Sequence, residues 1–211
     1  MTIRVVIAAS TDLVILGATS VFQTDERLTI AATTQNTNEL FLLAKELHPD
    51  ILLIEDEMDP DMEVLTVLER MRRVSPDTKL IVMGRQTDGY YARDLFTFGA
   101  HSYLYQCDEL KECLPLAIEL VMQNRLYLSP TINTEYLIAV QSASRDWQID
   151  PESLQVLRLL AQGQHVNQVA ATMSISRRRV YWVREKLRHR FGAQTNEHMI
   201  SKAAAEGLLR F

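Results

Sequence analysis

The chain contains few of the residues that mark secreted, membrane-spanning or disulfide-stabilised proteins. Only two of its 211 residues are cysteines, Cys107 and Cys113, and a helix would place them on different faces. No apolar run is long enough to span a bilayer, and the N-terminus lacks the charged and small-residue regions of a signal peptide. We therefore expect a cytoplasmic protein without a membrane partner. Both thiols should be reduced, and a redox switch between them is the weaker alternative.

The chain also lacks the residue patterns of common enzyme and cofactor sites. There is no glycine-rich loop that could cradle a phosphate group and no Cys/His cluster with zinc spacing. The histidines are scattered, and no Ser-His-Asp set stands out. Hydrophobic residues make up 47% of the chain and charged residues 23%, as in ordinary globular proteins. We predict no enzyme activity, no cofactor and no metal site.

Charges of opposite sign are concentrated in two parts of the chain. Residues 145–211 contain eleven lysines and arginines against six acidic residues, a net charge of +5. Residues 1–144 contain eleven against twenty-one, a net charge of −10, so the whole chain carries −5. A basic segment joined to an acidic one suggests nucleic acid as the partner of the basic segment. The acidic segment would repel DNA, which leaves the contact to residues 145–211.

Residues 168–191 follow the pattern of a helix, a tight turn and a second helix. Ser176 is a favourable N-cap for the second helix, because its hydroxyl can accept a hydrogen bond from an unpaired backbone N–H. Ile175 before the cap and Val180 inside the helix form a hydrophobic staple. An apolar stripe at helical spacing consists of Val180, Val183, Leu187 and Phe191. The pattern predicts a helix-turn-helix with one packed face and one polar face.

Three arginines, Arg177, Arg178 and Arg179, occupy the first turn of the predicted second helix. The helix dipole disfavours cations at that end by roughly 0.3–1 kcal/mol each, and a local rule broken three times in succession indicates a functional constraint. A phosphate backbone lying across the helix N-terminus would turn this cost into a gain. The alternative is a solvated charged face. Together with the turn, the cap and the staple, the arginines favour binding to double-stranded DNA.

Five apolar runs alternate with five amphipathic segments in residues 1–123. The expected strands span residues 3–9, 28–33, 51–55, 79–84 and 101–105, and the expected helices span residues 13–22, 37–48, 62–74, 89–98 and 108–123. This alternation predicts a doubly wound α/β domain whose five-stranded parallel sheet is covered by helices on both faces. Functional side chains in such a sheet are expected beyond the carboxyl ends of the strands.

The chain resembles the NarL/FixJ response regulators over nearly its whole length. The stretches PDILLIE at residues 49–55 and GAHSYLY at residues 99–105 resemble a CheY-like receiver. The stretches VLRLLAQG at residues 156–163 and AAEGLL at residues 204–209 resemble a LuxR-type helix-turn-helix. The resemblance implies a receiver-like domain at residues 1–123, a partly helical linker at 124–148 and an all-α DNA-binding domain at 149–211.

The receiver-like part departs from this resemblance at every position that handles a phosphoryl group. A working receiver uses two acids to hold Mg²⁺, an aspartate as acceptor, a Thr or Ser that senses the phosphate and a lysine that pairs with it. The aligned positions are Ala9 and Ser10, Glu55, Gly84 and Gln106. Mg²⁺ prefers carboxylate oxygens, and phosphoryl transfer relies on metal and cationic charge. We therefore predict that this domain is not phosphorylated.

Two acidic features beside these positions leave alternatives open. Glu55 either mimics a phosphorylated aspartate or only fills a disused pocket, and the absence of residues that would sense its charge favours the second. The loop with Asp56, Glu57, Asp59 and Asp61 either binds a cation loosely or is solvated, which is the more common role of such a run.

The resemblance also assigns roles outside this pocket. Residues 88–98 and 103–123 correspond to a face that family members commonly use for dimerisation. Tyr103 corresponds to an aromatic switch residue, but Gly84 leaves no Thr for it to follow. We therefore expect Tyr103 to be a buried packing residue.

These observations predict a transcriptional regulator of the response-regulator type that binds double-stranded DNA. The predicted phosphate contacts are Arg177, Arg178, Arg179, Arg184 and Lys186, and the predicted base contacts are Tyr181, Trp182 and Glu185. We expect a homodimer, because one small helix-turn-helix buries limited area and two half-sites add their energies.

Two other interpretations compete with this prediction. In the first, the receiver-like domain docks a partner protein and the helix-turn-helix has lost specific DNA binding. Tyr181 favours it slightly, because the family usually has a basic residue there. The second is a conventional phosphorylated regulator, which requires an acidic pocket that the sequence lacks. A small ligand or a partner protein at the receiver-like domain could replace phosphorylation as the input.

Overall fold

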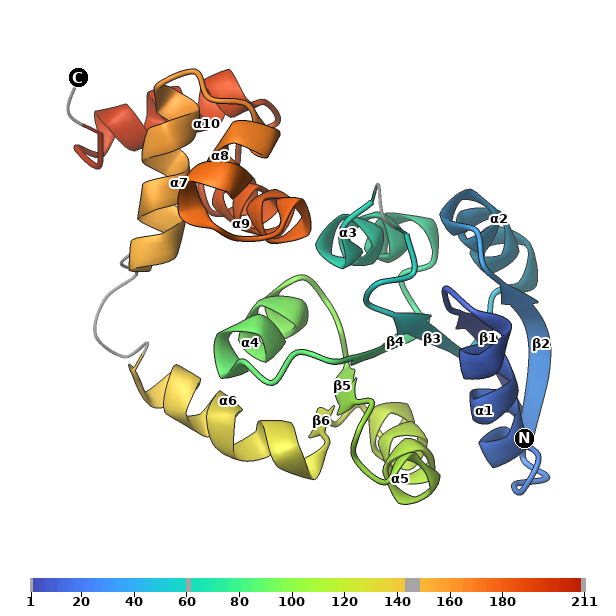
Figure 1. The fold of residues 1–211 in the computed structure, drawn as a ribbon. Coiled ribbons are helices and arrows are strands. Elements are labelled where there is room, and N and C mark those ends of the chain that lie inside the picture. Colours follow the sequence, from blue (N-terminus) through green and yellow to red (C-terminus); the bar gives the residue numbers. More distant parts are fainter. Residues whose placement is uncertain (1, 60–61, 143–148, 210–211) are drawn as a thin grey trace. The chain divides into compact units, whose positions relative to one another are not determined.

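A parallel sheet organises the first part of the chain (Figure 1). The computed structural model describes residues 2–59, 62–142 and 149–209 and divides into two units, Met1–Ser144 and Arg145–Phe211. The strands of the first unit are β1 Ile3–Ala8, β2 Leu28–Thr34, β3 Ile51–Glu55, β4 Lys79–Gly84, β5 Ser102–Tyr105 and β6 Tyr127–Leu128. Its helices are α1 Asp12–Phe22, α2 Thr37–Leu47, α3 Val64–Val74, α4 Gly89–Thr97, α5 Leu110–Met122 and α6 Pro130–Ser142.

The sheet has six parallel strands in the order β2-β1-β3-β4-β5-β6. The five expected strands are present, and the α/β class is confirmed. The predicted number of strands was wrong by one, because β6 pairs with Ser102 and Tyr103 of β5. A strand of two residues is too short to produce the alternation by which strands are recognised in a sequence.

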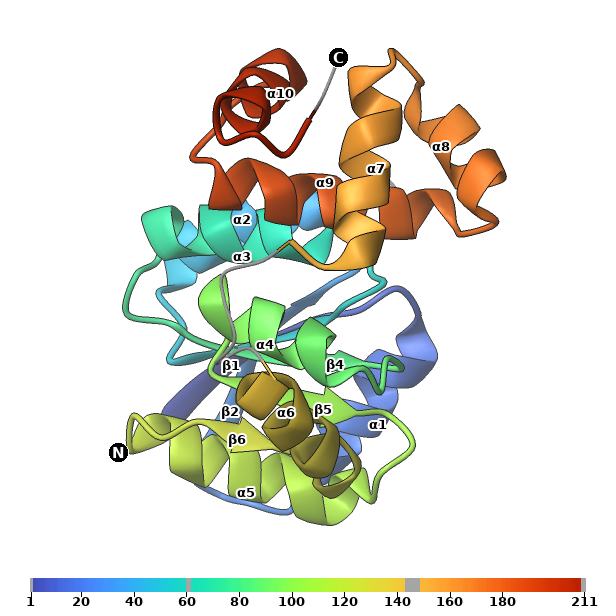
Figure 2. The ribbon, with the colours of Figure 1, turned by 90° about the vertical axis from the view of Figure 1, so that its left-hand side faces the viewer.

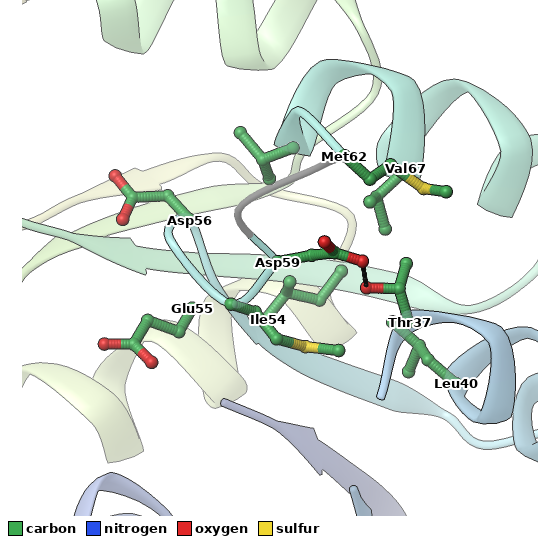
Figure 3. A pocket seen from close by; sticks show the side chains of 10 residues that line it. Thr37, Leu40, Ile54, Glu55, Asp56, Asp59, Met62 and Val67 are labelled. Carbon is green, nitrogen blue, oxygen red and sulfur yellow. Dashed lines mark hydrogen bonds between the residues drawn. The ribbon is translucent and has the colours of Figure 1, made fainter. Parts of the chain in front are cut away.

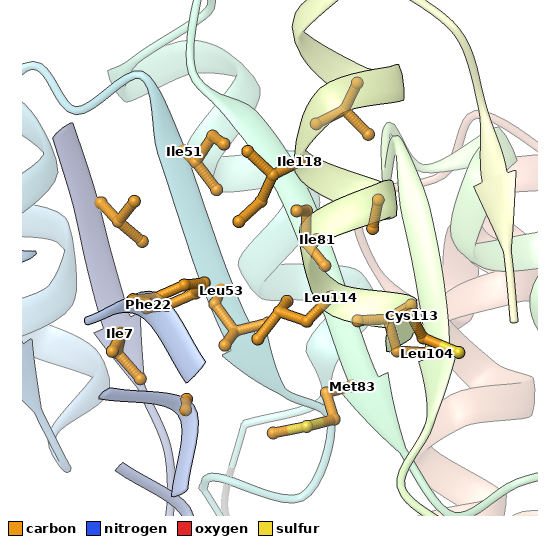
Figure 4. Close-up of a cluster of buried hydrophobic side chains, with 14 residues drawn as sticks. Ile7, Phe22, Ile51, Leu53, Ile81, Met83, Leu104, Cys113, Leu114 and Ile118 are labelled. Carbon is orange, nitrogen blue, oxygen red and sulfur yellow. The ribbon is translucent and has the colours of Figure 1, made fainter. Parts of the chain in front are cut away.

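Continuous apolar strands are expected where both faces of a sheet are covered, and all five residues of β3 are buried. Helices α1 and α5 cover one face and α2, α3 and α4 the other (Figures 1 and 2). Figure 4 shows side chains of the first face meeting in one cluster, where Leu53 of β3 and Ile81 of β4 lie near Leu114 of α5. Each fully buried side chain of this size contributes roughly 1.5–3 kcal/mol.

Helix α6 lies against α4 within the first unit (Figure 2). The rings of Phe96 in α4 and Tyr136 in α6 meet edge to face, with centroids 5.4 Å apart. The predicted linker at residues 124–148 therefore contributes β6 and α6 to the first unit, and its residues 143–148 lie outside the described residues. Part of the predicted dimerisation face, at residues 88–98, is covered by α6.

The second unit consists of four helices, α7 Pro151–Ala161, α8 Val166–Met173, α9 Arg177–Arg190 and α10 Asn196–Ala205. The expected Ser176 cap is present, and Asp150 caps α7. Ser176 Oγ accepts the Arg179 N–H at 3.0 Å, and Asp150 Oδ1 accepts the Ser153 N–H at 2.8 Å. The predicted apolar stripe of α9 is buried at Val180, Val183, Leu187 and Phe191. The helix-turn-helix is thus formed by α8, the turn and α9.

Cys113 is buried in the core of the first unit, whereas Cys107 is exposed, and both are free thiols. Among the described residues, no helix combines the length and the apolar character needed to cross a lipid bilayer.

Candidate receiver pocket and nucleic-acid interface

Three of the predicted pocket residues are joined by hydrogen bonds at the carboxyl ends of the strands. Glu55 Oε2 accepts the Ser10 N–H at 2.7 Å and the Ser10 hydroxyl at 2.6 Å. Gln106 Nε2 donates to Glu55 Oε1 at 3.1 Å, and Arg85 Nε donates to Gln106 Oε1 at 3.0 Å. Both oxygens of the Glu55 carboxylate therefore have partners in this chain. A further predicted pocket residue, Ala9, is buried, and its side chain offers no atom that could bind a metal ion.

Burial by itself would raise the pKa of Glu55. The hydrogen bonds from Ser10 and Gln106 and the nearby charge of Arg85 outweigh burial, so the pKa of Glu55 lies below its ordinary value of 4.5. Polar groups of the protein thus satisfy an ionised carboxylate in this pocket.

Replacing Glu55 with Gln is expected to weaken the acid sensitivity of the first unit. A folded-state pKa below the ordinary value of 4.5 means that the folded protein binds fewer protons than the unfolded chain in that range, so stability falls as the pH drops below about 4.5. A glutamine side chain cannot ionise, so this part of the pH dependence should disappear. At pH 7 the variant should lose roughly 1–2 kcal/mol of stability, because a charge-assisted hydrogen bond is replaced by a neutral one. Urea unfolding followed by circular dichroism between pH 3 and 7 measures both effects. An unchanged pH profile would contradict the described Glu55 contacts.

The last of the five predicted pocket positions is Gly84. The side chain of the neighbouring Asp56 fills the space where a side chain at position 84 would lie. A Cβ atom on Gly84 would lie 2.0 Å from Oδ2 of Asp56 and 2.4 Å from its Cγ. Asp56 is only 4% exposed, so the expectation of a solvated Asp56 was wrong. The physical reason is that a carboxylate fills the space that a Thr or Ser side chain at position 84 would take.

Two tyrosines surround the Asp56 carboxylate. The Tyr91 hydroxyl donates to Asp56 Oδ2 at 2.7 Å, and burial together with the Asp56 charge raises the pKa of Tyr91. The Tyr103 ring lies edge-on to Tyr91 with centroids 5.5 Å apart. The Tyr103 hydroxyl donates to the Gln86 carbonyl at 2.9 Å and accepts the Gln86 N–H at 3.0 Å. Tyr103 is fully buried and bonded on both sides, as expected for a packing residue.

The acidic loop after β3 does not gather its carboxylates at one point. Figure 3 shows Glu55 and Asp56 pointing away from Asp59, whose Oδ2 accepts the Thr37 hydroxyl at 2.6 Å. The small cavity beside Asp59 measures about 10 Å³, room for one water molecule at most. No group of three potential metal-ligating side chains occurs among the described residues, and Asp61 lies outside them.

In the second unit, one side of α9 faces the start of α7. Arg179 forms a two-point ion pair with Glu152, at 3.0 and 2.8 Å, and Lys186 Nζ lies 3.0 Å from Asp150 Oδ2. Trp182 stands between these two cations at helical spacing and is only 4% exposed. The predicted base contact Trp182 therefore has little exposed surface to offer a base. Trp182 is buried because it lies on the same side of α9 as Arg179 and Lys186, the side that faces α7.

Another side of α9 carries the remaining predicted contacts. Arg177 is exposed in the first turn, and the Arg184 guanidinium lies 4.7 Å from the centre of the Tyr181 ring. Glu185 accepts hydrogen bonds from Arg184 at 3.1 Å and from Arg188 at 3.0 Å. Its side chain is 15% exposed. A base that donates to Glu185 would have to compete with these arginines.

The residues that sequence reasoning missed at the receiver pocket are Asp56 and Tyr91. A signal for Asp56 does exist. Glu55 is paired with Met83 in the parallel sheet, so the residues that follow each of them are neighbours. An aspartate next to a glycine on the neighbouring strand indicates that the aspartate side chain fills the space left by the glycine. Tyr91 lies 35 residues from Asp56 along the chain, and no local pattern connects the two.

Known proteins that resemble this chain match it over both units. The chain is 22% identical over 218 residues to the oxygen regulatory protein NreC of Staphylococcus epidermidis, covering 99% of this chain and all of that protein. It is 24% identical over 210 residues to the response regulator GacA of Pseudomonas protegens, covering 98% of each. RcsB from Salmonella enterica serovar Typhimurium, solved bound to the promoter P1flhDC, superposes with a TM-score of 0.65 at 16% identity, covering 98% of this chain and all of RcsB. No protein-family model matches the chain.

A receiver-like α/β unit followed by a helix-turn-helix unit is also the architecture of the response regulators that the chain matches. The end-to-end likeness to NreC and GacA supports the resemblance to NarL/FixJ-type response regulators that the sequence indicates.

Proposed function

We propose that this response regulator is a transcription factor that binds double-stranded DNA through α9. The observation that carries the proposal is the first turn of α9, where Ser176 caps the helix and arginines occupy the next three positions. The likeness of the fold to RcsB, which was solved on a promoter, supports it.

Two cations of α9 form ion pairs with the start of α7. Arg179 and Lys186 are paired with acidic residues of the α7 region and hold α9 against α7. Arg177 is exposed and has no ion pair among the described residues. The proposed phosphate contacts are Arg177, Arg178 and Arg184, the last of which also pairs with Glu185, and the proposed base contacts are Tyr181 and Glu185. Trp182 has little exposed surface for a base and supports the position of α9.

Binding as a homodimer follows from the size of the DNA-binding unit. One helix enters one half-site, and two half-sites roughly add their energies. Because α6 covers part of the α4 face, the dimer contact should use a different surface of the first unit.

Replacing Arg177 with Ala is expected to lower DNA affinity about fivefold to tenfold at 0.1 M salt, because one phosphate contact is lost. The slope of the logarithm of the binding constant against the logarithm of salt concentration should fall by about one. Fluorescence anisotropy with mixed-sequence and selected duplexes over a salt series measures both quantities.

Arg158→Ala is the matched control, since Arg158 is an exposed arginine of α7 in the same unit. It makes the same change in net charge outside α9 and should leave the slope nearly unchanged. Equal slopes for both variants would show that α9 does not contact phosphates. If the protein does not bind DNA even at low salt, the proposal fails. The interpretation that the receiver-like domain docks a partner protein would then replace it.

The receiver-like domain is proposed not to accept a phosphoryl group. The Glu55 oxygens are already bonded to Ser10 and Gln106, and Ala9 cannot hold a metal ion. Neither Gly84 nor Gln106 supplies the hydroxyl or cation that would stabilise a bound phosphoryl group.

Incubation with acetyl phosphate and Mg²⁺ is expected to leave the mass of the intact protein unchanged. A conventional receiver of known reactivity, treated in parallel, shows that the donor is active. A gain of one phosphoryl mass that disappears in Glu55→Gln would overturn this proposal, whereas the proposal of DNA binding through α9 would stand.

A further inference from the structure

A cavity of about 220 Å³ lies in the first unit between α1 and α5. Its walls are mainly apolar and include Val14 and Val21 of α1, Met83 of β4 and Leu114 of α5, the last two of which are labelled in Figure 4. Among the described residues that line it, Gln106 is the one with a polar side chain, and none is charged. The cavity therefore combines an apolar wall with a single polar end.

The sequence of α1 keeps this space open. Gly17 lies inside an 11-residue helix, where a glycine costs roughly 0.5–1 kcal/mol relative to alanine. A Cβ atom on Gly17 would meet nothing within 4 Å, and the backbone there is not in the left-handed region. Neither close packing nor backbone conformation requires this glycine. A larger side chain at position 17 would extend toward the preceding turn, over Leu13 and Val14, which line the cavity.

We infer that this cavity is a binding site for a small, uncharged and largely apolar molecule with one hydrogen-bonding group. A charged ligand would be desolvated without a partner, because no lining side chain carries a charge. Apolar cavities of about 150 Å³ already bind benzene, and drug-sized ligands occupy roughly 300–1,000 Å³. A volume of about 220 Å³ thus fits a ligand of one or two small rings.

Gln106 gives the ligand a polar contact and connects the cavity to the receiver pocket. Its amide nitrogen donates to Glu55 and its amide oxygen accepts from Arg85. An amide oxygen has a second lone pair, which is free to accept an N–H or O–H from a ligand. A molecule bound there touches the group that holds Glu55. The binding site goes beyond the proposed DNA-binding function and does not depend on it.

The test is a titration of the full-length protein with indole, an uncharged aromatic probe with one N–H donor. Methyl-labelled NMR spectra should show saturable shifts at Val14, Val21, Leu110 and Leu114. Gly17→Leu and Gly17→Met should each weaken indole binding at least about tenfold, because their side chains occupy the space. Gly17→Ala is the matched control and should keep the affinity within about twofold, since its single methyl meets no neighbouring atom. The charged analogue indole-3-carboxylate should not bind.

Two results would overturn the inference, and a further experiment would then assign the surface. The first is the absence of indole shifts at the cavity methyl groups up to the solubility limit. The second is binding that persists unchanged in both filled variants, which would place the site elsewhere. The further experiment concerns Leu13 and Leu16 of α1, which are exposed and apolar. If indole does not bind and Leu16→Asp converts a dimer into a monomer in sedimentation experiments, the surface is an interface between copies of the chain.

Discussion

Replacing Gly84 with Thr, which restores the residue type of a working receiver, is expected to destabilise the first unit by roughly 2–4 kcal/mol. The Cβ atom of the new threonine would overlap the Asp56 carboxylate, because it would lie 2.0 Å from Oδ2 of Asp56. Asp56 cannot turn aside freely, because it is buried and bonded to the Tyr91 hydroxyl. Chemical unfolding followed by circular dichroism measures the loss. Both tryptophans, Trp147 and Trp182, belong to the second unit, so tryptophan fluorescence provides an internal control that should not change.

A double-mutant cycle assigns the effect to this contact. Asp56→Ala alone leaves the Tyr91 hydroxyl without this partner and should cost about 1–3 kcal/mol. The combination of Asp56→Ala with Gly84→Thr should be more stable than the sum of the single losses by about 1–3 kcal/mol, because the clash is removed. Additive losses, or a Gly84→Thr variant as stable as the parent protein, would show that Asp56 does not occupy this space.

Replacing Gly89 with Ala is expected to separate α6 from α4. A Cβ atom on Gly89 would lie 2.0 Å from the backbone oxygen of Glu135 and 2.7 Å from the Tyr136 nitrogen. Backbone atoms within a helix cannot rotate away from a clash, so α6 must move as a whole and lose the contact between Phe96 and Tyr136. The expected cost is about 2–4 kcal/mol. Hydrogen exchange should show protection falling by about tenfold or more across α6, because each factor of ten corresponds to about 1.4 kcal/mol of local stability.

Gly17→Ala is the control for this variant, since it makes the same chemical change inside a helix without a neighbouring atom within 4 Å. That variant should gain about 0.5–1 kcal/mol. Opposite signs for the two substitutions would confirm that the approach of α4 to α6 is what requires glycine at position 89. A stabilised Gly89→Ala variant would contradict the close packing of these helices.

The elements that could be predicted are those whose own residues form a recognisable pattern, such as an apolar run, a cap or an apolar stripe. The strands β3 and β4 were predicted with their observed bounds, because buried parallel strands are continuous apolar runs flanked by breaks in the pattern. Helix α9 was predicted from its cap and its stripe, both of which are local. The resemblance to receivers singled out Ser10, Glu55 and Gln106, and the rule that functional side chains lie at the carboxyl ends of parallel strands agrees with their position. Their mutual hydrogen bonds were not predicted.

The features that were missed depend on pairs of residues distant in the sequence. Asp56 was expected to be solvated because its neighbours in the chain are acidic, but its burial is decided by Gly84 and Tyr91. Trp182 was predicted to contact bases because it lies off the apolar stripe of α9, but the ion pairs of Arg179 and Lys186 place that side of α9 against the start of α7. Such contacts require the fold before they can be recognised.

The short strand β6 has a consequence for how the first unit behaves in isolation. The Tyr127 N–H donates to the His101 carbonyl at 3.2 Å, the Ser129 N–H donates to the Tyr103 carbonyl at 3.1 Å, and the Ser129 hydroxyl oxygen accepts the Tyr105 N–H at 2.9 Å. These bonds occupy the outer edge of β5. A fragment ending at Gln123 would present that edge with unpaired backbone groups, a template on which another chain can add a strand. The residues after α5 therefore protect the β5 edge from the addition of a strand of another chain, and a soluble receiver fragment has to extend past Ser129.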